Sequence, residues 1–249
     1  MLDLPDPFYA LGEHIAIDLP GARAVFTTRR GGVSKPPYDG LNLGPRVQED
    51  RDGAAANRRL LADELKVDLT DVRQVHGTHV HRTQARSDPS EAPTEADGIA
   101  TTTPRLAAVV LAADCLPIAI AGGGAVAAVH GGWQGLEGGV IAAGVEAVRE
   151  LSSSPAPQPL AAAIGPGASA CCYEVSDELH ERFASKGLDY RNGRNLDLKR
   201  IAAAQLRAAG VKQIHTLPLC TICSPEHLFF SHRRDHGVTG RQAGLAWLT

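Results

Sequence analysis

The chain has 249 residues, which is enough to bury a sizeable core in one large domain or two small ones. Charged residues make up 21% of it, and 25 Lys and Arg stand against 28 Asp and Glu, for a formal net charge of −3. This balance excludes the strongly basic surface of proteins that bind nucleic acid or anionic membranes, so we expect neither as a partner.

The periodicity of apolar residues predicts strands and helices that interleave along the chain. Strands are expected at 24–28, 72–80, 106–113, 117–121, 125–129, 160–164, 211–216 and 227–231. Helices are expected at 52–65, 136–151 and 196–209. Because the spacing is not a regular alternation of strand and helix, it favours an α+β fold with a mixed sheet over a doubly wound fold. No composition shift marks a boundary, so residues 1–249 are expected to form a single domain.

Two polar stretches between these elements are expected to be surface loops. One is the Ser- and Pro-rich stretch 152–159, and the other is the acidic stretch 86–97. Residues 1–20 lack the basic start and apolar run of a secretory signal, and no stretch reaches the roughly 18 apolar residues of a membrane helix. The five cysteines are an odd number without an export signal, which predicts thiols or metal ligands in a cytoplasmic protein.

Three residues stand out as candidate metal ligands: His76, Cys115 and His130. Each lies at or just past the end of an expected strand and beside Gly or Pro, where a rigid support presents reactive side chains. Two imidazoles and a thiolate with a fourth position open are typical of a catalytic zinc site. On spacing alone a bland alternative stays open, in which the cysteine is a small core residue and the histidines are ordinary polar groups.

A second candidate site lies closer together in the sequence. Cys220 and Cys223 form a CxxC pair, and three histidines follow it, at His227, His232 and His236. The set could form a structural Cys2His2 zinc site, although a zinc finger has a longer separation between its two ligand pairs. Whether these cysteines bind a second metal is left open by the sequence.

A third candidate is the histidine run at His76, His79 and His81, whose spacing suggests copper. A copper site of the electron-transfer type groups a Cys with two His and usually an axial Met. The chain's single Met is Met1, and no His flanks Cys115. A polar strand face therefore explains the run better than a copper site.

Anion-binding groups form the next class. Arg29 precedes the glycine pair 31–32, and Arg233 belongs to an Arg-Arg pair near the C-terminus. Backbone amides of a glycine turn together with a guanidinium can hold phosphate or carboxylate, although a solvated turn is the simpler reading of either alone. Nucleotide-binding glycine motifs, the G-x-S-x-G motif and the HExxH motif are all missing from the sequence.

Ten short motifs together resemble one known family, in order from residue 26 to residue 243. They are Phe-Thr-Thr-Arg-Arg-Gly-Gly-Val-Ser at 26–34, Leu-Asn-Leu-Gly at 41–44, Asn-Arg at 57–58, Gln-Val-His-Gly at 74–77, Ala-Asp-Cys-Leu-Pro at 113–117, His-Gly-Gly-Trp at 130–133, Ile-Gly-Pro at 164–166, Cys-Tyr-Glu-Val at 172–175, Phe-Phe-Ser-His-Arg-Arg-Asp at 229–235 and Thr-Gly-Arg-Gln-Ala at 239–243. The chain resembles the laccase-domain family, also called multicopper polyphenol oxidoreductase or peptidoglycan editing factor.

The resemblance implies a fold, a metal site and an activity. The implied fold is a layered α+β arrangement with helices outside packed sheets. The family's metal ligands fall on His76, Cys115 and His130, which implies zinc as the cofactor, with copper less well suited to these residues. The implied activity is that of a purine nucleoside phosphorylase acting on adenosine, inosine or guanosine with phosphate, with adenosine deamination as a side activity. Two alternatives are an amidase that edits peptidoglycan precursors and, less well matched, a copper-dependent polyphenol oxidase.

For such an enzyme we expect the following roles. Asp114 joins the three metal ligands as a catalytic candidate, because it is the nearest carboxylate for moving a proton, or else it orients a ligand. Arg29 is expected in the phosphate site, with Arg233 as a second candidate. Asn42 and Gln74 are expected to contact the hydroxyls or the base edge of the substrate.

One position departs from the family pattern. The family usually reads His-Ala-Gly-Trp-Arg-Gly after the third ligand, whereas this chain has Gln134 in place of the Arg. Glutamine cannot form a charged bidentate clamp on an anion. The substitution therefore predicts weaker use of phosphate, if that Arg holds the substrate's anionic group.

Overall fold

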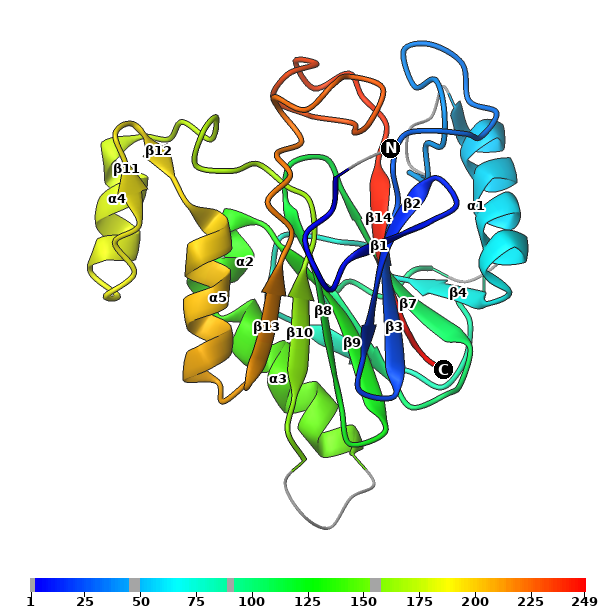
Figure 1. Ribbon diagram of the computed structural model, residues 1–249, viewed down its shortest axis with the longest axis horizontal. Coiled ribbons are helices and arrows are strands. Elements are labelled where there is room, and N and C mark those ends of the chain that lie inside the picture. Colours follow the sequence, from blue (N-terminus) through cyan, green and yellow to red (C-terminus); the bar gives the residue numbers. More distant parts are fainter. Residues whose placement is uncertain (1–2, 45–49, 89–91, 153–157) are drawn as a thin grey trace.

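The computed structural model describes residues 3–44, 50–88, 92–152 and 158–249. Its framework is a pair of six-stranded sheets that lie face to face (Figure 1). The first sheet has the order β1 (Tyr9–Leu11), β2 (His14–Leu19), β3 (Ala22–Phe26), β14 (Gln242–Leu248), β7 (Leu106–Ala112) and β4 (Asp68–Asp71). The second has the order β13 (Gln213–Thr216), β10 (Ala161–Ile164), β8 (Leu116–Gly122), β9 (Ala125–Gly131), β6 (Gly98–Thr101) and β5 (Val80–Arg82).

Both sheets are mixed. The β4–β7, β5–β6 and β10–β13 pairs are parallel, whereas the central pairs, such as β8–β9 and β7–β14, are antiparallel. Hairpins make some of the antiparallel pairs, such as β2–β3 and β8–β9, and longer connections make the others and the parallel pairs. This arrangement confirms the predicted α+β class with mixed sheets.

Side chains of the central strands alternate between two cores, as the pleat of a strand requires. On β8, Ile118 and Ile120 face the helices, and Ala119 and Ala121 face the other sheet. Alanine therefore lines much of the space between the sheets. These small side chains let the sheets approach closely, as at Gly244 of β14, where an added Cβ would lie 2.4 Å from the Pro117 Cβ.

Helices cover the two outer faces. The helix α1 (Arg51–Leu65) packs on the first sheet through Leu61, whereas α2 (Trp133–Gly138), α3 (Val140–Leu151) and α5 (Leu198–Ala208) contribute to the core on the outer face of the second sheet. The helix α4 (Asp177–Ala184) and the ribbon β11 (Arg191–Asn192) and β12 (Asn195–Leu196) lie beside α5 at one end of the molecule (Figure 1). This confirms the layered arrangement that the resemblance implied.

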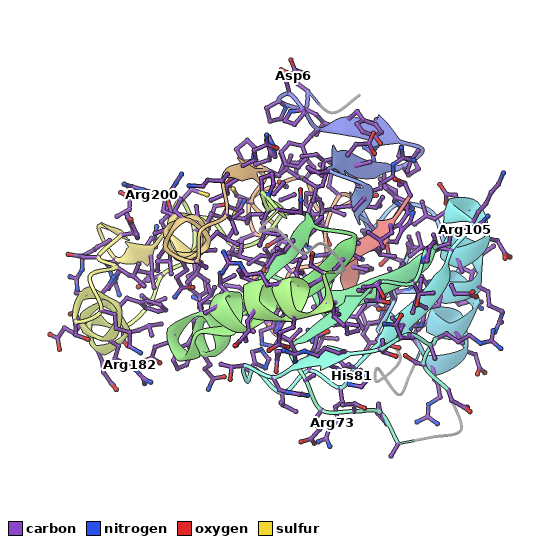
Figure 2. The ribbon with its side chains drawn as sticks, turned by 90° about the horizontal axis from the view of Figure 1, so that it is seen from below. Asp6, Arg73, His81, Arg105, Arg182 and Arg200 are labelled. Carbon is purple, nitrogen blue, oxygen red and sulfur yellow. The ribbon has the colours of Figure 1, made fainter. Side chains whose placement is uncertain are left out.

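Many of the charged side chains lie at the periphery. Arg105, Arg182 and Arg200 are exposed and project from the outer surface of the molecule (Figure 2). Within the described residues, no helix is long and apolar enough to cross a membrane.

Three predicted elements differ from the structure. The expected helix 136–151 is two helices, because Gly139 adopts φ +99° and ends α2 before α3 starts. The expected strand 72–80 is mostly loop, since the backbone N–H groups of residues 75–77 bind a carboxylate and not a neighbouring strand. The expected strand 227–231 is an apolar loop, whose Phe230 pairs its backbone with the Gln242 side chain at 2.8 and 3.0 Å.

Several other elements were not predicted, and the central strand β14 is the most important of them. It lies between β3 and β7 and joins the last residues of the chain to the middle of the first sheet. The expected loop 152–159 falls mostly on residues outside the described ranges, as do residues 89–91 of the loop 86–97.

Candidate metal centre and active site

Three neighbouring strands of the second sheet bring the candidate ligands together. Cys115 lies in the turn from β7 to β8, directly before β8. His130 lies near the end of β9 and pairs in register with Pro117 of β8. His76 lies in the loop between β4 and β5, whose course is fixed against the start of β6. The sheet therefore brings together residues that are up to 54 positions apart in the sequence.

The three side chains form a compact donor set. Their ligand atoms all lie within 4.8 Å of one another, and Cys115 Sγ lies 3.9 Å from His76 Nε2. The two imidazole rings meet edge to face, with centroids 4.9 Å apart and planes at 76°. His130 is buried, Cys115 is half-buried and His76 is exposed. The donor set is therefore covered by protein on the His130 side and open to solvent on the His76 side.

The Asp97 carboxylate organises this set from behind. It is fully buried directly before β6, and its Oδ1 lies 2.9 Å from His130 Nδ1. The same carboxylate accepts the backbone N–H groups of Val75 at 3.1 Å, His76 at 3.0 Å and Gly77 at 2.6 Å. One side chain therefore orients the His130 ring, leaving its Nε2 for a metal, and also holds the loop that carries His76.

A glycine leaves room for the donor set. A Cβ on Gly132 would lie 2.9 Å from His76 Cδ2, 3.3 Å from Cys115 Sγ and 3.5 Å from His130 Cε1. All three candidate ligands therefore surround this one backbone position. The space at Gly132 is the kind that a side chain would fill if the three residues were merely packed core.

The electrostatics of the set favour a thiolate. Burial raises the pKa of Cys115, but the adjacent His130 and His76 lower it by more. The net pKa is therefore below that of a free thiol. Burial has the opposite effect on His130 and lowers its pKa. The neighbouring Cys115 and Asp97 outweigh burial, so the net pKa of His130 is raised. A thiolate beside two imidazoles is a donor set that suits zinc.

The Asp114 side chain supports the turn that carries Cys115. Asp114 has φ +91°, a left-handed conformation that is uncommon outside glycine and marks a constrained position. Its carboxylate accepts the Thr221 hydroxyl at 2.6 Å and the backbone N–H of Arg233 at 2.7 Å. Both oxygens are thus engaged in joining three segments, which makes Asp114 a positioning residue more readily than a proton carrier.

A cavity of about 440 Å³ opens over the donor set, within the roughly 300–1,000 Å³ range of small-molecule sites. It is lined by both apolar and polar groups. The lining residues are Asp71, Val72, Gln74, His76, Leu111, Ala112, Ala113, Asp114, Cys115, His130, Tyr173, His232, Arg233 and Arg241.

Two of the predicted substrate-binding residues line this cavity. Arg233 does so from the C-terminal loop, with its guanidinium 5.3 Å from the centre of the Tyr173 ring and bonded to Glu174 O. Gln74 does so too, but its amide pairs with the backbone of Leu111 at 2.7 and 2.8 Å. Gln74 therefore ties its loop to β7 and presents its remaining surface to the cavity.

The other two predicted residues lie elsewhere. Arg29 is buried, donates to the carbonyl and carboxylate of Asp39, and stacks 4.7 Å from the centre of the Phe230 ring. Asn42 is fully buried and accepts the backbone N–H groups of Gly44 and Arg241. Neither is among the lining residues of the cavity, and both hold loops in place around it.

Several residues in the cavity carried no predicted role. Arg241 is held by the carbonyls of Thr239 and Gly240, and burial lowers its pKa while nearby Cys115 and Asp114 raise it. In the sequence, Arg241 belongs to the Thr-Gly-Arg motif at 239–241. This motif contributed to the family resemblance, but it did not indicate a role for the arginine. Asp97, which is buried behind the donor set and does not line the cavity, lies at the end of a stretch that was expected to be a surface loop.

Tyr173 is another cavity residue to which the sequence analysis assigned no role. Burial raises the pKa of its phenol, and Cys115 adds to this, to a value of about 12. The phenol therefore stays protonated at neutral pH and can donate a hydrogen bond into the cavity. Gln134, the departure from the family pattern, is exposed on α2 and is absent from the cavity lining.

A second group of possible metal ligands lies outside this cavity. Across the described part of the chain, His/Cys/Asp/Glu groups that could hold a metal are the set above and four cysteines, Cys171, Cys172, Cys220 and Cys223. The predicted companions of the CxxC pair, His227, His232 and His236, do not belong to it. The second cysteine pair, and not the histidines, completes the group.

The fold and the site define an α+β protein with a His2Cys metal-binding group at the floor of a small-molecule cavity. Residues 23–249 match the family described as multi-copper polyphenol oxidoreductase laccase, and the chain belongs to this family. The resemblance seen in the motifs is thus confirmed.

Relatives with an assigned activity share most of the chain. A purine nucleoside phosphorylase of Streptomyces coelicolor is 40% identical over 238 residues, covering 92% of this chain and 96% of that protein. One of Mycobacterium tuberculosis is 38% identical over 234 residues, covering 91% and 92%.

Solved structures agree with the fold. A Bacillus licheniformis protein titled hypothetical protein YfiH is 32% identical with a TM-score of 0.85, covering 98% of this chain and 100% of that one. The protein YlmD of Geobacillus stearothermophilus is 31% identical with a TM-score of 0.83, covering 98% and 99%.

Proposed function

We propose that the protein is a zinc-dependent purine nucleoside phosphorylase that uses phosphate to cleave adenosine, inosine or guanosine, with adenosine deamination as a side activity. The observation that carries the proposal is the His2Cys set at the floor of a cavity that two arginines also line. Relatives at 35–40% identity that are named purine nucleoside phosphorylase support the same substrate class.

The donor set fits zinc. His76, Cys115 and His130 offer two nitrogens and one thiolate from one side, which leaves a fourth position toward the cavity. When bound there, zinc supplies Lewis acidity toward a water or a substrate oxygen. Copper suits the set less well, because an electron-transfer copper site usually adds an axial Met and the sequence has a single Met, at position 1.

The remaining cavity residues supply what phosphorolysis requires. In this reaction the bond from the sugar C1′ to the purine nitrogen breaks, its electron pair leaves with the purine, and a phosphate oxygen bonds to C1′. The purine gains a proton, and the products are the free base and ribose 1-phosphate. Arg233 and Arg241 are the cations in the cavity lining, so we assign them to the phosphate.

The neutral groups of the cavity suit the nucleoside. The protonated phenol of Tyr173 can donate to a sugar or base acceptor, and Val72 and Leu111 offer apolar surface to the purine. Asp114 keeps its predicted place in the site, where we assign it to positioning the Cys115 turn and the backbone of Arg233. In deamination, water adds to the purine C6 and ammonia leaves, which yields inosine.

The five cysteines are all free, which supports a reducing, cytoplasmic location.

The proposal is tested by incubating zinc-loaded protein with adenosine, inosine or guanosine, with and without phosphate, and separating the products by chromatography. The expected products are free base and ribose 1-phosphate in equal amounts, formed only with phosphate, and some inosine from adenosine. Release of free ribose without phosphate, or no product from a zinc-loaded protein, would contradict the proposal.

A further inference from the structure

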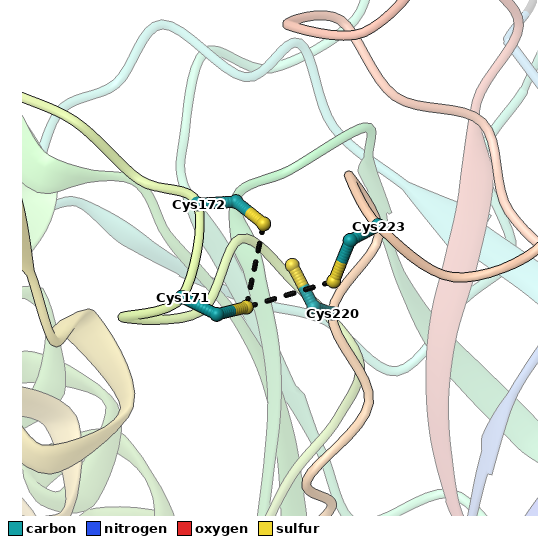
Figure 3. A group of neighbouring side chains, drawn as sticks. All are labelled: Cys171, Cys172, Cys220 and Cys223. Carbon is teal, nitrogen blue, oxygen red and sulfur yellow. Dashed lines mark hydrogen bonds between the residues drawn. The ribbon is translucent and has the colours of Figure 1, made fainter.

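Two pairs of cysteines meet at one end of the second sheet. Cys171 and Cys172 lie in the turns that follow β10, and Cys220 and Cys223 lie in the turn that follows β13. Because β10 and β13 are parallel neighbours, their carboxyl ends lie side by side, and the pairing extends to a bridge between Gly167 and Cys220. The four side chains consequently turn toward one common point (Figure 3).

The sulfur positions match the ligand shell of a single ion. All four Sγ atoms lie within 4.8 Å of one another, with Cys171 at 3.6 Å from Cys223 and at 3.4 Å from Cys172. Four thiolates about 2.3 Å from a zinc ion at the centre of a tetrahedron stand about 3.8 Å apart. The separations of 3.4 and 3.6 Å are close to this edge length, and no pair of these sulfurs is more than 4.8 Å apart.

A buried cation binds the segment that leads into Cys220. The buried ammonium of Lys199 donates to Leu217 O at 2.8 Å and Leu219 O at 2.7 Å, on the segment that leads into Cys220. This buried cation partly offsets the net negative charge that four thiolates retain around a divalent ion.

We propose that Cys171, Cys172, Cys220 and Cys223 bind a second, structural zinc ion. A closed set of four thiolates leaves no position for a substrate, so the site is structural and distinct from the His2Cys set. The common point of four sulfurs, each within 4.8 Å of the others, suits one ion.

This ion would join two segments that form a wall of the catalytic cavity. Thr221, directly after Cys220, donates to the Asp114 carboxylate at 2.6 Å, and the backbone N–H of Ala168 donates to Asp114 O at 2.7 Å. Tyr173, directly after Cys172, lines the cavity itself. The second zinc therefore cross-links the two loops that support Asp114 and Tyr173.

The test is metal content, which does not depend on the activity. The wild-type protein, purified under reducing conditions, is compared with a Cys171→Ser/Cys223→Ser variant and with His76→Ala by elemental analysis. The wild type should hold about two zinc ions per chain and each variant about one, and a variant that combines all three changes about none. Cys171 and Cys223 are exposed, so serine at these positions does not disturb the core, and circular dichroism checks the fold.

Cobalt substitution distinguishes the two sites by their ligands. The strong sulfur-to-cobalt absorption of a four-thiolate site should persist in His76→Ala and disappear in Cys171→Ser/Cys223→Ser. The proposal is overturned if the double serine variant keeps the wild-type metal content, if the four cysteines bind iron, or if mass spectrometry of the reduced preparation finds them paired as disulfides.

Discussion

The Asp97 carboxylate lies 2.9 Å from Nδ1 of His130 and positions two of the three candidate metal ligands. It fixes the tautomer and direction of the His130 ring while binding three backbone N–H groups of the loop that carries His76. A carboxylate behind a histidine ligand raises the basicity of that ligand and holds its ring in place. Metal affinity should therefore depend on Asp97 although it is not itself a ligand.

Replacing Asp97 with Asn tests this dependence. An amide offers one acceptor oxygen where the carboxylate offers two, so either the His130 ring or the loop 75–77 loses its partner. We expect metal affinity at the His2Cys site to fall by about 10- to 100-fold. Competition with a chromophoric chelator measures it, in the Cys171→Ser/Cys223→Ser background so that only one site is read. Glu95→Gln, which alters the nearby exposed Arg73–Glu95 pair, should leave the affinity unchanged.

Substituting Gly132 tests whether the room between the three ligands is required. In Gly132→Ala the new methyl group meets His76, Cys115 and His130 at 2.9 to 3.5 Å, so the donor atoms must separate. We predict loss of the metal from this site with the overall fold retained. The matched control is Gly131→Ala, whose methyl group would lie against Ile118 and Leu116. Equal metal content in both variants would show that the donor set does not need this space.

Substitutions of Arg241, which we assign to the phosphate, and of Arg29, which the sequence analysis expected in the phosphate site, should have opposite outcomes. Arg241→Gln removes a cation from the cavity and should raise the KM for phosphate by about tenfold or more, as expected for a lost charge-assisted hydrogen bond. Arg29→Gln removes contacts to Asp39 and Phe230, so it should lower the free energy of unfolding by about 1–3 kcal/mol. Steady-state kinetics with varied phosphate and thermal melts separate the two effects. A large rise in the KM for phosphate in a stable Arg29→Gln protein would return Arg29 to the phosphate site.

Restoring the family's arginine at position 134 should change little. Gln134 is exposed on α2 and does not line the cavity, so a cation there is solvated and screened. We expect Gln134→Arg to alter the KM for phosphate by less than about twofold, as for an ordinary surface substitution. A clear fall in this KM would show that phosphate binds beside α2 and not between Arg233 and Arg241.

The sequence predicted the parts of the fold that follow from local apolar patterns. Strands 106–113 and 117–121 and the helix 52–65 agree with β7, β8 and α1 to within one or two residues. It missed β14, whose sequence has small residues where the sheets approach closely, and it predicted a strand at 227–231 because apolar burial alone does not distinguish a strand from a buried loop.

The candidate site shows the same difference between features that are local in the sequence and contacts between distant segments. Ligand types and expected strand ends made His76, Cys115 and His130 one of three candidate sets, and the motifs of the family resemblance selected it. The partners of Arg29 and the orientation of Asp97 depend on loops far apart in the chain, so spacing could not give them. The same holds for the four cysteines, whose two pairs meet only because β10 lies beside β13.

The most direct test of the account joins metal content to catalysis in one protein. Wild type and His130→Ala are reconstituted with zinc, and each is assayed for zinc per chain and for the rate of ribose 1-phosphate formation from inosine and phosphate. We predict that His130→Ala lacks about one zinc ion per chain and loses nearly all phosphorolysis, with its fold preserved by circular dichroism. Phosphorolysis at the wild-type rate by a variant that lacks this zinc would contradict the account.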